Sequence, residues 1–273
     1  MPVIAMTREI GSLGTDVAAG LAANLGLKII DSDIAVNTAA GSLGVGQTTV
    51  QRYMDGSASM FERWRINKSK LSRYTSEQIL KLAQEGNVLI RGWGAAALFQ
   101  GIPHVIKVRI CAPMAFREHI INERLGGSKE ADAIRAEIER YDAARASTIR
   151  DSFNIDRENA RLYHIVLNTS ELTIDTCVKT ICLLAQDPQF QDDAAARAAI
   201  VDKLLAIKVS AELRERLGVE MATIVVSAAN GKIILEGNSS ATFPARAEKM
   251  ARGIDGVHDI ENRIVGAPNP EGF

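Results

Sequence analysis

Two glycines spaced for an anion-binding turn follow the first apolar run of the chain. The run at 3–6 has the composition of a short buried strand, and Gly11 and Gly14 lie in the polar turn behind it. Apolar residues then recur at spacings of three and four, as on one face of a helix. A strand, a glycine turn and a helix in this order bring free backbone N–H groups and the positive helix end to one point. The stretch therefore predicts a phosphate site, and a plain strand-to-helix turn is the alternative that the pattern leaves open.

The turn departs from the Walker pattern GxxxxGK[ST] at the lysine. When 11–15 is laid on the end of that pattern, Thr15 takes the place of the Mg²⁺-binding hydroxyl and Gly14 the place of the lysine. The lysine normally neutralises charge on the β- and γ-phosphates, so its absence needs compensation. Arg8, in the same turn, is the nearest candidate. The predicted phosphate-binding residues are therefore Arg8, Gly11, Ser12, Leu13, Gly14 and Thr15, with Thr15 also holding the metal.

Charged or aromatic residues follow the next apolar runs as well. Asp31 and Asp33 come at the end of the second run, and Arg91 and Trp93 come at the end of the third. In an open parallel sheet, ligands bind outside the carboxyl ends of the strands, so Asp31 and Asp33 are candidates for binding the substrate or a metal. Two alternatives stay open, because Asp33 could cap a helix and Trp93 could cover the edge of the core. The strands we expect are 3–6, 27–31, 87–91, 104–111 and 162–170.

These motifs resemble the cytidylate kinase-like family. Its members open with a loop of the Ser-Arg-Glu-Phe-Gly-Ser-Gly-Gly type, similar to 7–14 here, and carry an Asp after the second strand. Their last strand ends in the same Tyr-His…Asn-Thr-Ser run as 163–170. Leu13 departs from a family glycine, and Trp93 stands where the family commonly has an arginine that grips the nucleotide phosphate. The resemblance therefore makes Arg91, one residue earlier, and Trp93, which could stack on a base, candidates for substrate binding. The resemblance implies a three-layer α/β P-loop kinase core with a parallel sheet, ATP and Mg²⁺ as cofactors, and a small acceptor such as CMP.

The resemblance also gives a meaning to four charged residues on two later helical patterns. Arg117 lies on the first pattern, and Arg140, Asp142 and Arg145 lie on the second. In the lid of nucleoside monophosphate kinases, arginines close over the transferring phosphoryl group and neutralise its charge. The four residues are therefore candidate catalytic residues. Asp142 and Arg145, three apart on a helix, can pair, and a common surface ion pair is the alternative.

The helical segment 41–84 carries many basic and aromatic side chains. In the kinases that the chain resembles, an insertion at this place closes over the monophosphate. For most of its residues we favour a solvated basic face with an aromatic core stripe, made by Tyr53, Met60, Phe61 and Trp64.

A polar stretch with one proline at 187–193 marks a change of composition. Behind it the pattern predicts helices at 194–207 and 211–217, and then two apolar runs that flank Asn230-Gly231, which is a strong hairpin signal. A helix at 243–252 and a final strand complete a pattern that resembles a BON domain. The resemblance implies a small α+β module with a regulatory, partner-binding or lipid-binding role. The expected division is 1–186 for the kinase-like domain, 187–193 for a linker, 194–267 for the BON-like domain and 268–273 for a tail.

Composition narrows the class of protein. The 273 residues have a net charge of −1 and are 47% hydrophobic, which excludes a disordered chain and one with a strong general affinity for nucleic acid. The three cysteines have no metal-ligand spacing and are expected to be small core residues in a reducing cytosol. The N-terminus lacks a signal-peptide pattern and no apolar run approaches about 20 residues, so we expect a cytoplasmic protein without membrane contact. A homo-oligomer or a protein partner at the BON-like domain stays open, since a hairpin has a free edge.

Two functional hypotheses follow from the sequence. The first is a nucleotide-dependent phosphotransferase of the nucleoside monophosphate kinase type, which moves a phosphoryl group from ATP to a small acceptor. The second is a non-catalytic nucleotide-binding regulator whose BON module binds a partner or a lipid. The missing lysine, Leu13 and Trp93 motivate the second hypothesis.

Overall fold

The computed structural model describes residues 2–31, 40–41, 44–55, 57–92, 94–127, 130–191 and 193–267. The chain divides into two compact units, Met1–Asp192 and Asp193–Phe273. Asp33 and Trp93, two of the predicted substrate-binding residues, lie outside the described residues.

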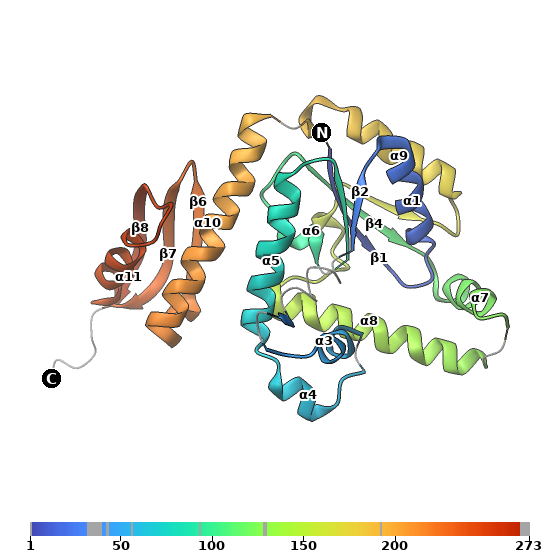
Figure 1. Cartoon of the computed structure of the whole chain (residues 1–273), viewed down its shortest axis with the longest axis horizontal. Coiled ribbons are helices and arrows are strands. Elements are labelled where there is room, and N and C mark those ends of the chain that lie inside the picture. Colours follow the sequence, from blue (N-terminus) through green and yellow to red (C-terminus); the bar gives the residue numbers. More distant parts are fainter. Residues whose placement is uncertain are drawn as a thin grey trace. The chain divides into compact units, whose positions relative to one another are not determined.

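The first unit is built on a parallel sheet of five strands with the order β2-β3-β1-β4-β5 (Figure 1). The strands are β1 (Val3–Arg8), β2 (Lys28–Asp31), β3 (Val88–Arg91), β4 (Val105–Cys111) and β5 (Ile165–Asn168). All five expected strands are present. The central strand β1 pairs with β3 on one side and with β4 on the other, in registers that align Val3 with Val88 and with Val105.

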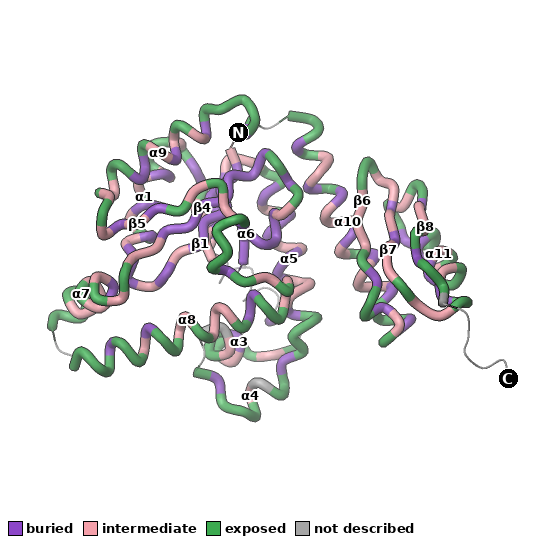
Figure 2. The backbone as a smooth tube through the Cα atoms, turned by 180° about the vertical axis from the view of Figure 1, so that it is seen from behind, coloured by how far each residue is buried: buried purple, intermediate pink, exposed green. Residues whose placement is uncertain are grey.

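Helices cover both faces of this sheet and make the three-layer α/β fold that the resemblance implied. On one face, α1 (Gly14–Leu25) and α9 (Ile174–Gln186) pack together over β1 and β4. On the other, α5 (Lys68–Gln84) packs on β3 and the short α6 (Ala95–Leu98) on β1. Strands β1 and β4 are buried along almost their whole length (Figure 2), as expected for a parallel sheet covered twice.

The remaining helices of this unit gather around α8 (Ala131–Phe153), the longest of them. It contacts α3 (Gln47–Asp55), α5, α6 and α7 (Met114–Arg124). The left-handed Asn154 ends α8, and two short 3₁₀ turns, η1 (Ala160–Leu162) and η2 (Pro188–Phe190), lie further along the chain. The fold thus sets one face of α8 across the carboxyl ends of the strands.

The predicted aromatic core stripe in 41–84 is wrong. The segment breaks into α3, α4 (Met60–Arg65) and α5, because Ser59 forms a capping box with Glu62 and Asn67 caps the next helix. On α4, 88% of Met60, 65% of Phe61 and 82% of Trp64 is exposed. The core-facing positions of this region are taken instead by aliphatic side chains, among them Ile66, Leu71, Ile79 and Leu80.

The second unit is a three-stranded sheet covered by two helices. The hairpin of β6 (Ile224–Ala229) and β7 (Lys232–Ser240) is present as predicted, and Asn230 and Gly231 have the positive φ angles of 52° and 75° that such a turn requires. Helix α11 (Phe243–Arg252) then leads to β8 (Asp259–Ala267), which pairs with β7 in parallel. The α10 helix (Ala194–Leu217) packs on β6, and the 3₁₀ turn η3 (Gly218–Thr223) joins the two.

One helix replaces the two that were predicted at 194–207 and 211–217. Val209 is fully buried and lies one and two turns before Leu213 and Leu217, so the apolar stripe of α10 runs through the expected gap. Asp193 caps the helix by accepting from the Ala196 amide at 2.7 Å.

Asp202, a nearly buried residue of α10, holds the hairpin turn. Its carboxylate oxygens accept from the backbone N–H groups of Asn230 at 2.7 Å and Gly231 at 2.8 Å. These charge-assisted bonds fasten the turn of one element to the middle of another.

We predict that Asp202→Ala loosens the hairpin in the intact chain. The loss of two hydrogen bonds to a charged group is expected to cost about 1.5–3 kcal/mol of local stability. Hydrogen–deuterium exchange should then be faster in peptides from 224–240 and unchanged in those from β1 and β4. Asp255→Ala, which removes an exposed carboxylate of the same unit, is the control. Equal exchange in both variants would show that the Asp202 contacts do not hold the turn.

Candidate functional site

The loop between β1 and α1 is held by buried polar contacts. Ser12 is fully buried, and its hydroxyl donates to the carbonyl of Glu9 at 2.8 Å, while Thr169 at the end of β5 donates to the Ser12 carbonyl at 2.8 Å. Gly11 has a φ of 78°, and a Cβ there would lie 2.7 Å from the Arg117 carbonyl oxygen, so glycine is required at this position. The Ser12 N–H, predicted to hold phosphate, donates inside the loop to Glu9 at 3.3 Å.

Helix α1 begins without a side-chain cap. Leu13 is the N-cap in the left-handed conformation, with φ 55° and ψ 12°, and its side chain accepts no hydrogen bond from the first turn. Thr15 is exposed in that turn, and Asp16 is paired with Arg124 at 2.7 Å. The Asp16 N–H donates to the Leu13 carbonyl at 3.0 Å, whereas the N–H groups of Gly14 and Thr15 have no partner among the described residues. These two N–H groups and the Thr15 hydroxyl are the ones that could meet an oxyanion and a Mg²⁺ ion that keeps phosphate oxygens as its other ligands.

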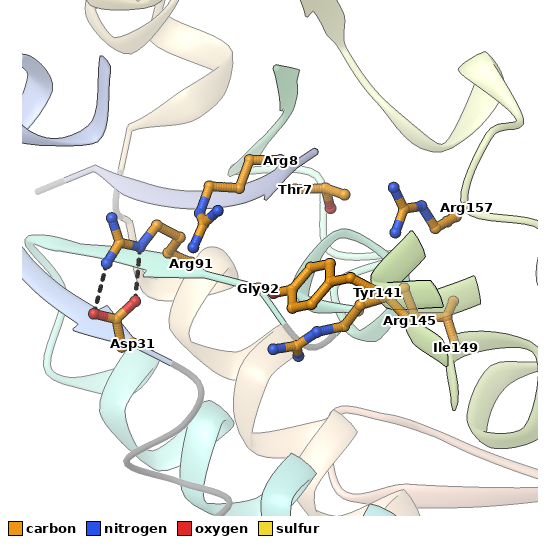
Figure 3. Close-up of a pocket in the computed structure, with 10 residues that line it drawn as sticks. Thr7, Arg8, Asp31, Arg91, Gly92, Tyr141, Arg145, Ile149 and Arg157 are labelled. Atoms are coloured by element: carbon orange, nitrogen blue, oxygen red, sulfur yellow. Dashed lines mark hydrogen bonds and ion pairs between the residues drawn. The ribbon is translucent and has the colours of Figure 1, made fainter. Parts of the chain in front are cut away.

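Arg8 lies across the position where the Walker pattern has its lysine. A Cβ on Gly14 would stand 2.7 Å from the Arg8 Cβ and 3.2 Å from its Cδ, so the methylene groups of Arg8 run directly over Gly14. Glycine at this point makes room for the arginine, and the guanidinium extends beyond it into a pocket (Figure 3).

The pocket lies at the carboxyl ends of β1, β2 and β3, below one face of α8 (Figure 3). The residues that line it are Thr7, Arg8, Asp31, Arg91, Gly92, Gly94, Tyr141, Arg145, Ile149 and Arg157. Asp31 accepts from Nε and Nη2 of Arg91 at 2.7 Å each, which is a bidentate pair. Among the described lining residues there are four arginines and one carboxylate, so their side chains carry a net positive charge.

The surroundings of Arg8 make it a receptor for negative charge. Within the described residues its guanidinium has no hydrogen-bond or ion-pair partner. The pKa of Arg8 is lowered mainly by burial. Tyr141 opposes this shift, the positive charges of Arg91 and Arg145 add to it, and Asp31 has the smallest effect, which raises the pKa. A cation whose charged form is disfavoured in this way is stabilised by an anion that enters the pocket.

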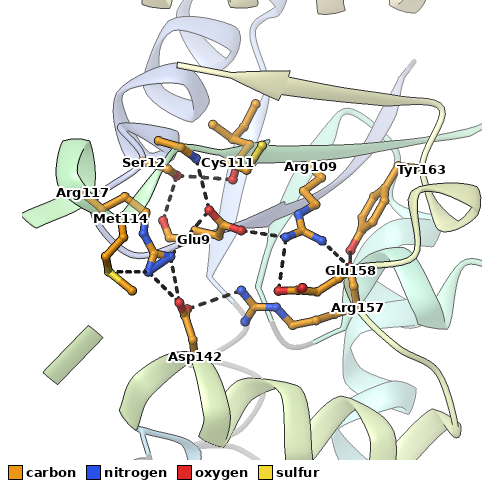
Figure 4. Close-up of polar contacts among 12 residues, drawn as sticks. Glu9, Ser12, Arg109, Cys111, Met114, Arg117, Asp142, Arg157, Glu158 and Tyr163 are labelled. Atoms are coloured by element: carbon orange, nitrogen blue, oxygen red, sulfur yellow. Dashed lines mark hydrogen bonds and ion pairs between the residues drawn. The ribbon is translucent and has the colours of Figure 1, made fainter. Parts of the chain in front are cut away.

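A second cluster of charges lies behind the loop (Figure 4). Glu9 accepts from Arg109 at 2.7 Å and from the Ala112 amide at 3.1 Å, and it lies 3.5 Å from Arg117. Asp142 accepts from Nη1 and Nη2 of Arg117 at 2.8 and 2.6 Å, and from Arg157 at 3.4 Å. These contacts connect the loop to β4, α7 and α8.

The pKa values in this cluster reflect burial first and charge second. Burial raises the pKa of Asp142, and Arg117 and Arg157 oppose that rise. Burial alone would lower the pKa of Arg109, but the hydrogen bond and the charge of Glu9 reverse the effect and raise it.

The structure separates the predicted site residues into groups. Arg8, Asp31, Arg91 and Arg145 line the pocket together. Arg117 and Asp142 belong to the buried cluster, where Asp142 bonds to Arg117 and Arg157, and Arg117 is 3% exposed. The remaining predicted catalytic arginine, Arg140, is exposed on α8 and does not line the pocket.

Several residues of these two groups were not among the predicted site residues, and five of them have polar or charged side chains that matter most for the site. They are Thr7, Glu9, Arg109, Tyr141 and Arg157. Tyr141 could have been found from its place next to Asp142 and four positions before Arg145, whose guanidinium carbon lies 5.1 Å from the tyrosine ring centroid. Arg157 has no such signal, because it lies in an irregular segment between α8 and η1.

Comparison with known proteins identifies a different family for each of the two units. The model of the cytidylate kinase-like family matches residues 3–171, and the BON domain model matches residues 201–268. The chain belongs to the cytidylate kinase-like family. No curated protein matches it.

Among solved structures, the chain is similar to an uncharacterized protein from Eubacterium ventriosum. The two are 16% identical, with a TM-score of 0.52 over 67% of this chain and 98% of the other. A shikimate kinase from Bacteroides thetaiotaomicron is 15% identical, with a TM-score of 0.42 over 68% of this chain and 99% of its own. The first similarity concerns the fold alone, and the second carries no argument about this chain.

Two further findings concern metals and membranes. Over the described ranges, no three His, Cys, Asp or Glu side chains come together as a metal cluster. None of the helices in the described part of the chain has the length and apolar character to cross a bilayer.

We predict that Gly14→Ala destabilises the first unit. The new methyl group would meet the Arg8 Cβ at 2.7 Å, and the resulting overpacking is expected to cost about 1–3 kcal/mol. Chemical denaturation followed by near-ultraviolet circular dichroism measures the change. Gly41→Ala is the control, because a Cβ at Gly41 meets nothing within 4 Å. Equal midpoints for the two variants would contradict the packing of Arg8 over Gly14.

Proposed function

We propose that the first unit is a phosphotransferase that moves a phosphoryl group from ATP to a small anionic acceptor of the nucleoside monophosphate class. The observation that carries the proposal is the Arg8 guanidinium, which has no hydrogen-bond or ion-pair partner among the described residues and extends from the end of β1 into a pocket lined by three further arginines. Membership of the cytidylate kinase-like family supports both the reaction class and CMP as the first acceptor to test. The BON domain takes a regulatory or ligand-binding role in this proposal.

The donor phosphates are assigned to the start of α1. The N–H groups of Gly14 and Thr15 lie in a first turn without a side-chain cap, where the helix dipole favours negative charge. The Thr15 hydroxyl is exposed there and can ligate Mg²⁺, which, when bound, neutralises donor phosphate charge and orients the phosphates. Arg8 supplies the positive charge that the absent lysine would give.

The acceptor is assigned to the end of the pocket at β2 and β3. Arg91 is held by two bonds to Asp31, which fixes the plane of its guanidinium and leaves Nη1 unused by that pair. Tyr141 and Arg145 reach the same space from α8. Arginines fixed in this way stabilise the charge that spreads over the phosphoryl oxygens during transfer.

We predict that Arg8→Met and Arg145→Ala each abolish most of the turnover. The loss of one charge-stabilising donor is expected to lower kcat on the order of 10²–10³-fold. The measurement is diphosphate formation from ATP, Mg²⁺ and a pool of monophosphates that includes CMP and dCMP.

Arg150→Ala is the matched control, since Arg150 is exposed on the same helix as Arg145 and does not line the pocket. Wild-type turnover in both pocket variants would refute the assigned roles. If the wild-type protein binds ATP and forms no diphosphate from any acceptor, the non-catalytic regulator replaces this proposal.

We predict that Thr15→Val weakens ATP binding only when Mg²⁺ is present. The valine keeps the shape of the side chain and removes the hydroxyl that we assign to the metal, so the affinity for Mg²⁺-ATP should fall about tenfold, or about 1.4 kcal/mol. Titration calorimetry with ATP, with Mg²⁺ and then with EDTA, separates the two contributions. Thr180→Val, which removes an exposed hydroxyl of α9, is the control. An equal loss with and without Mg²⁺ would remove Thr15 from the metal site.

A further inference from the structure

Arg157 is a nearly buried cation that lines the pocket and is poorly paired. It is 3% exposed, and its Nε has no hydrogen-bond partner within the described residues. Among the described side chains it forms an ion pair with Asp142 alone, at 3.4 Å. A guanidinium that is withdrawn from water needs short bonds to acceptors, so this pairing leaves part of its charge without compensation.

The other two arginines of the buried cluster have shorter ion pairs, although Nε of Arg117 also lacks a hydrogen-bond partner among the described residues. Arg109 lies 2.7 Å from Glu9 and 3.6 Å from Glu158. Arg117 makes the two short bonds to Asp142 and lies near Glu9. Oδ2 of Asp142 thus forms both short bonds to Arg117, and Oδ1 forms the longer bond to Arg157.

The backbone around Arg157 is held firmly in place. The Arg157 carbonyl accepts from Nη1 of Arg109 at 2.9 Å and from the Tyr163 hydroxyl at 2.7 Å. In Figure 3 the Arg157 side chain enters the pocket from the side opposite the Asp31–Arg91 pair. The cation is therefore placed in advance, away from the single carboxylate that lines the pocket.

We infer that Arg157 binds an oxyanion of the phosphate or pyrophosphate class in this pocket, and that Asp142 competes with that oxyanion for it. The inference deepens the proposed function, since it adds a binding residue to the same pocket. The role inferred for Arg157 is to bind the anion, so it can be tested without measuring turnover. A phosphate oxygen within 3 Å would supply the short charge-assisted bond that Asp142 does not give.

The test is titration calorimetry of the full chain with inorganic pyrophosphate, supported by circular dichroism of each variant. Arg157→Gln removes the charge and should weaken pyrophosphate binding about tenfold, which corresponds to about 1.4 kcal/mol. Asp142→Asn keeps the shape, removes the competitor and should tighten binding several-fold. The double variant Arg157→Gln/Asp142→Asn should lose that gain, because the two residues act on one contact.

The opposite signs distinguish a binding role from a structural one. If Arg157 only supports the fold, both single variants lose stability and neither changes the affinity of the folded protein. Arg161→Gln, at an exposed arginine four residues away, controls for the loss of one positive charge. Unchanged pyrophosphate affinity in folded Arg157→Gln overturns the inference.

The Asp142→Asn variant keeps the inference testable if Arg157→Gln does not fold. Tighter binding then supports it, and equal or weaker binding overturns it. The outcome is separate from that of the proposed function, because a protein that forms no diphosphate can still show the predicted signs with pyrophosphate. A working kinase whose affinity ignores Arg157 would refute this inference alone.

Discussion

The carboxylate of Glu9 is the contact on which the phosphate loop depends. It is nearly buried beneath the loop, and it joins the end of β1 to Arg109 of β4, to the Ala112 amide and to Arg117 of α7. Without this carboxylate, Arg109 would lose its shortest ion pair and Arg117 would keep only its bonds to Asp142. The loss of one partner of a buried ion pair is among the most costly changes in a protein. The charged contacts of Glu9 on the inner side of the loop therefore fix its conformation, and the outer side is the one that can bind a ligand.

The pocket differs from the buried cluster around Glu9, because its described arginines are not matched by carboxylates of its own. Asp31 is committed to Arg91 by two bonds, and Asp142 serves two arginines of which only Arg157 lines the pocket. In the described part of the pocket, the arginines at the carboxyl ends of β1 to β3 thus outnumber the carboxylates. Binding energy from an anion offsets this repulsion, and an anion that binds only the folded state raises its stability.

The sequence predicted the parts of this arrangement that are local. A glycine turn between a strand and a helix, an Asn-Gly hairpin and the strand ends at Asp31 and Arg91 each follow from residues that are neighbours in the chain. The partners of Asp142 could not be predicted in this way. Sequence spacing suggests Arg145 as the partner of Asp142, because it is three positions away on the same helix. The bonds observed go instead to Arg117 on another helix and to Arg157 in an irregular segment.

Burial was also hard to predict where helices are short. Aromatic residues at helical spacing suggested a core stripe, and yet α4 is six residues long and its caps turn Met60, Phe61 and Trp64 outward. For α10 the prediction was wrong in the opposite direction, since two helices were expected and one is present. The polar neighbours Lys208 and Ser210 suggested a break, but Val209 belongs to an apolar stripe that is recognisable only over the full length of the helix. Capping and periodicity have to be weighed together over the whole element.

The position of β1 in the sheet has a consequence for how the protein folds. Its residues pair only with β3 and β4, with Val3 aligned to Val88 and Val105, while the next strand in the chain lies at the sheet edge. The central ladder therefore closes over long loops of chain, and such non-local pairing is slow. Because β1 precedes both β3 and β4 in the chain, it is synthesised before either partner and stays unpaired until they follow, which exposes its apolar side chains to aggregation and to chaperones in the meantime.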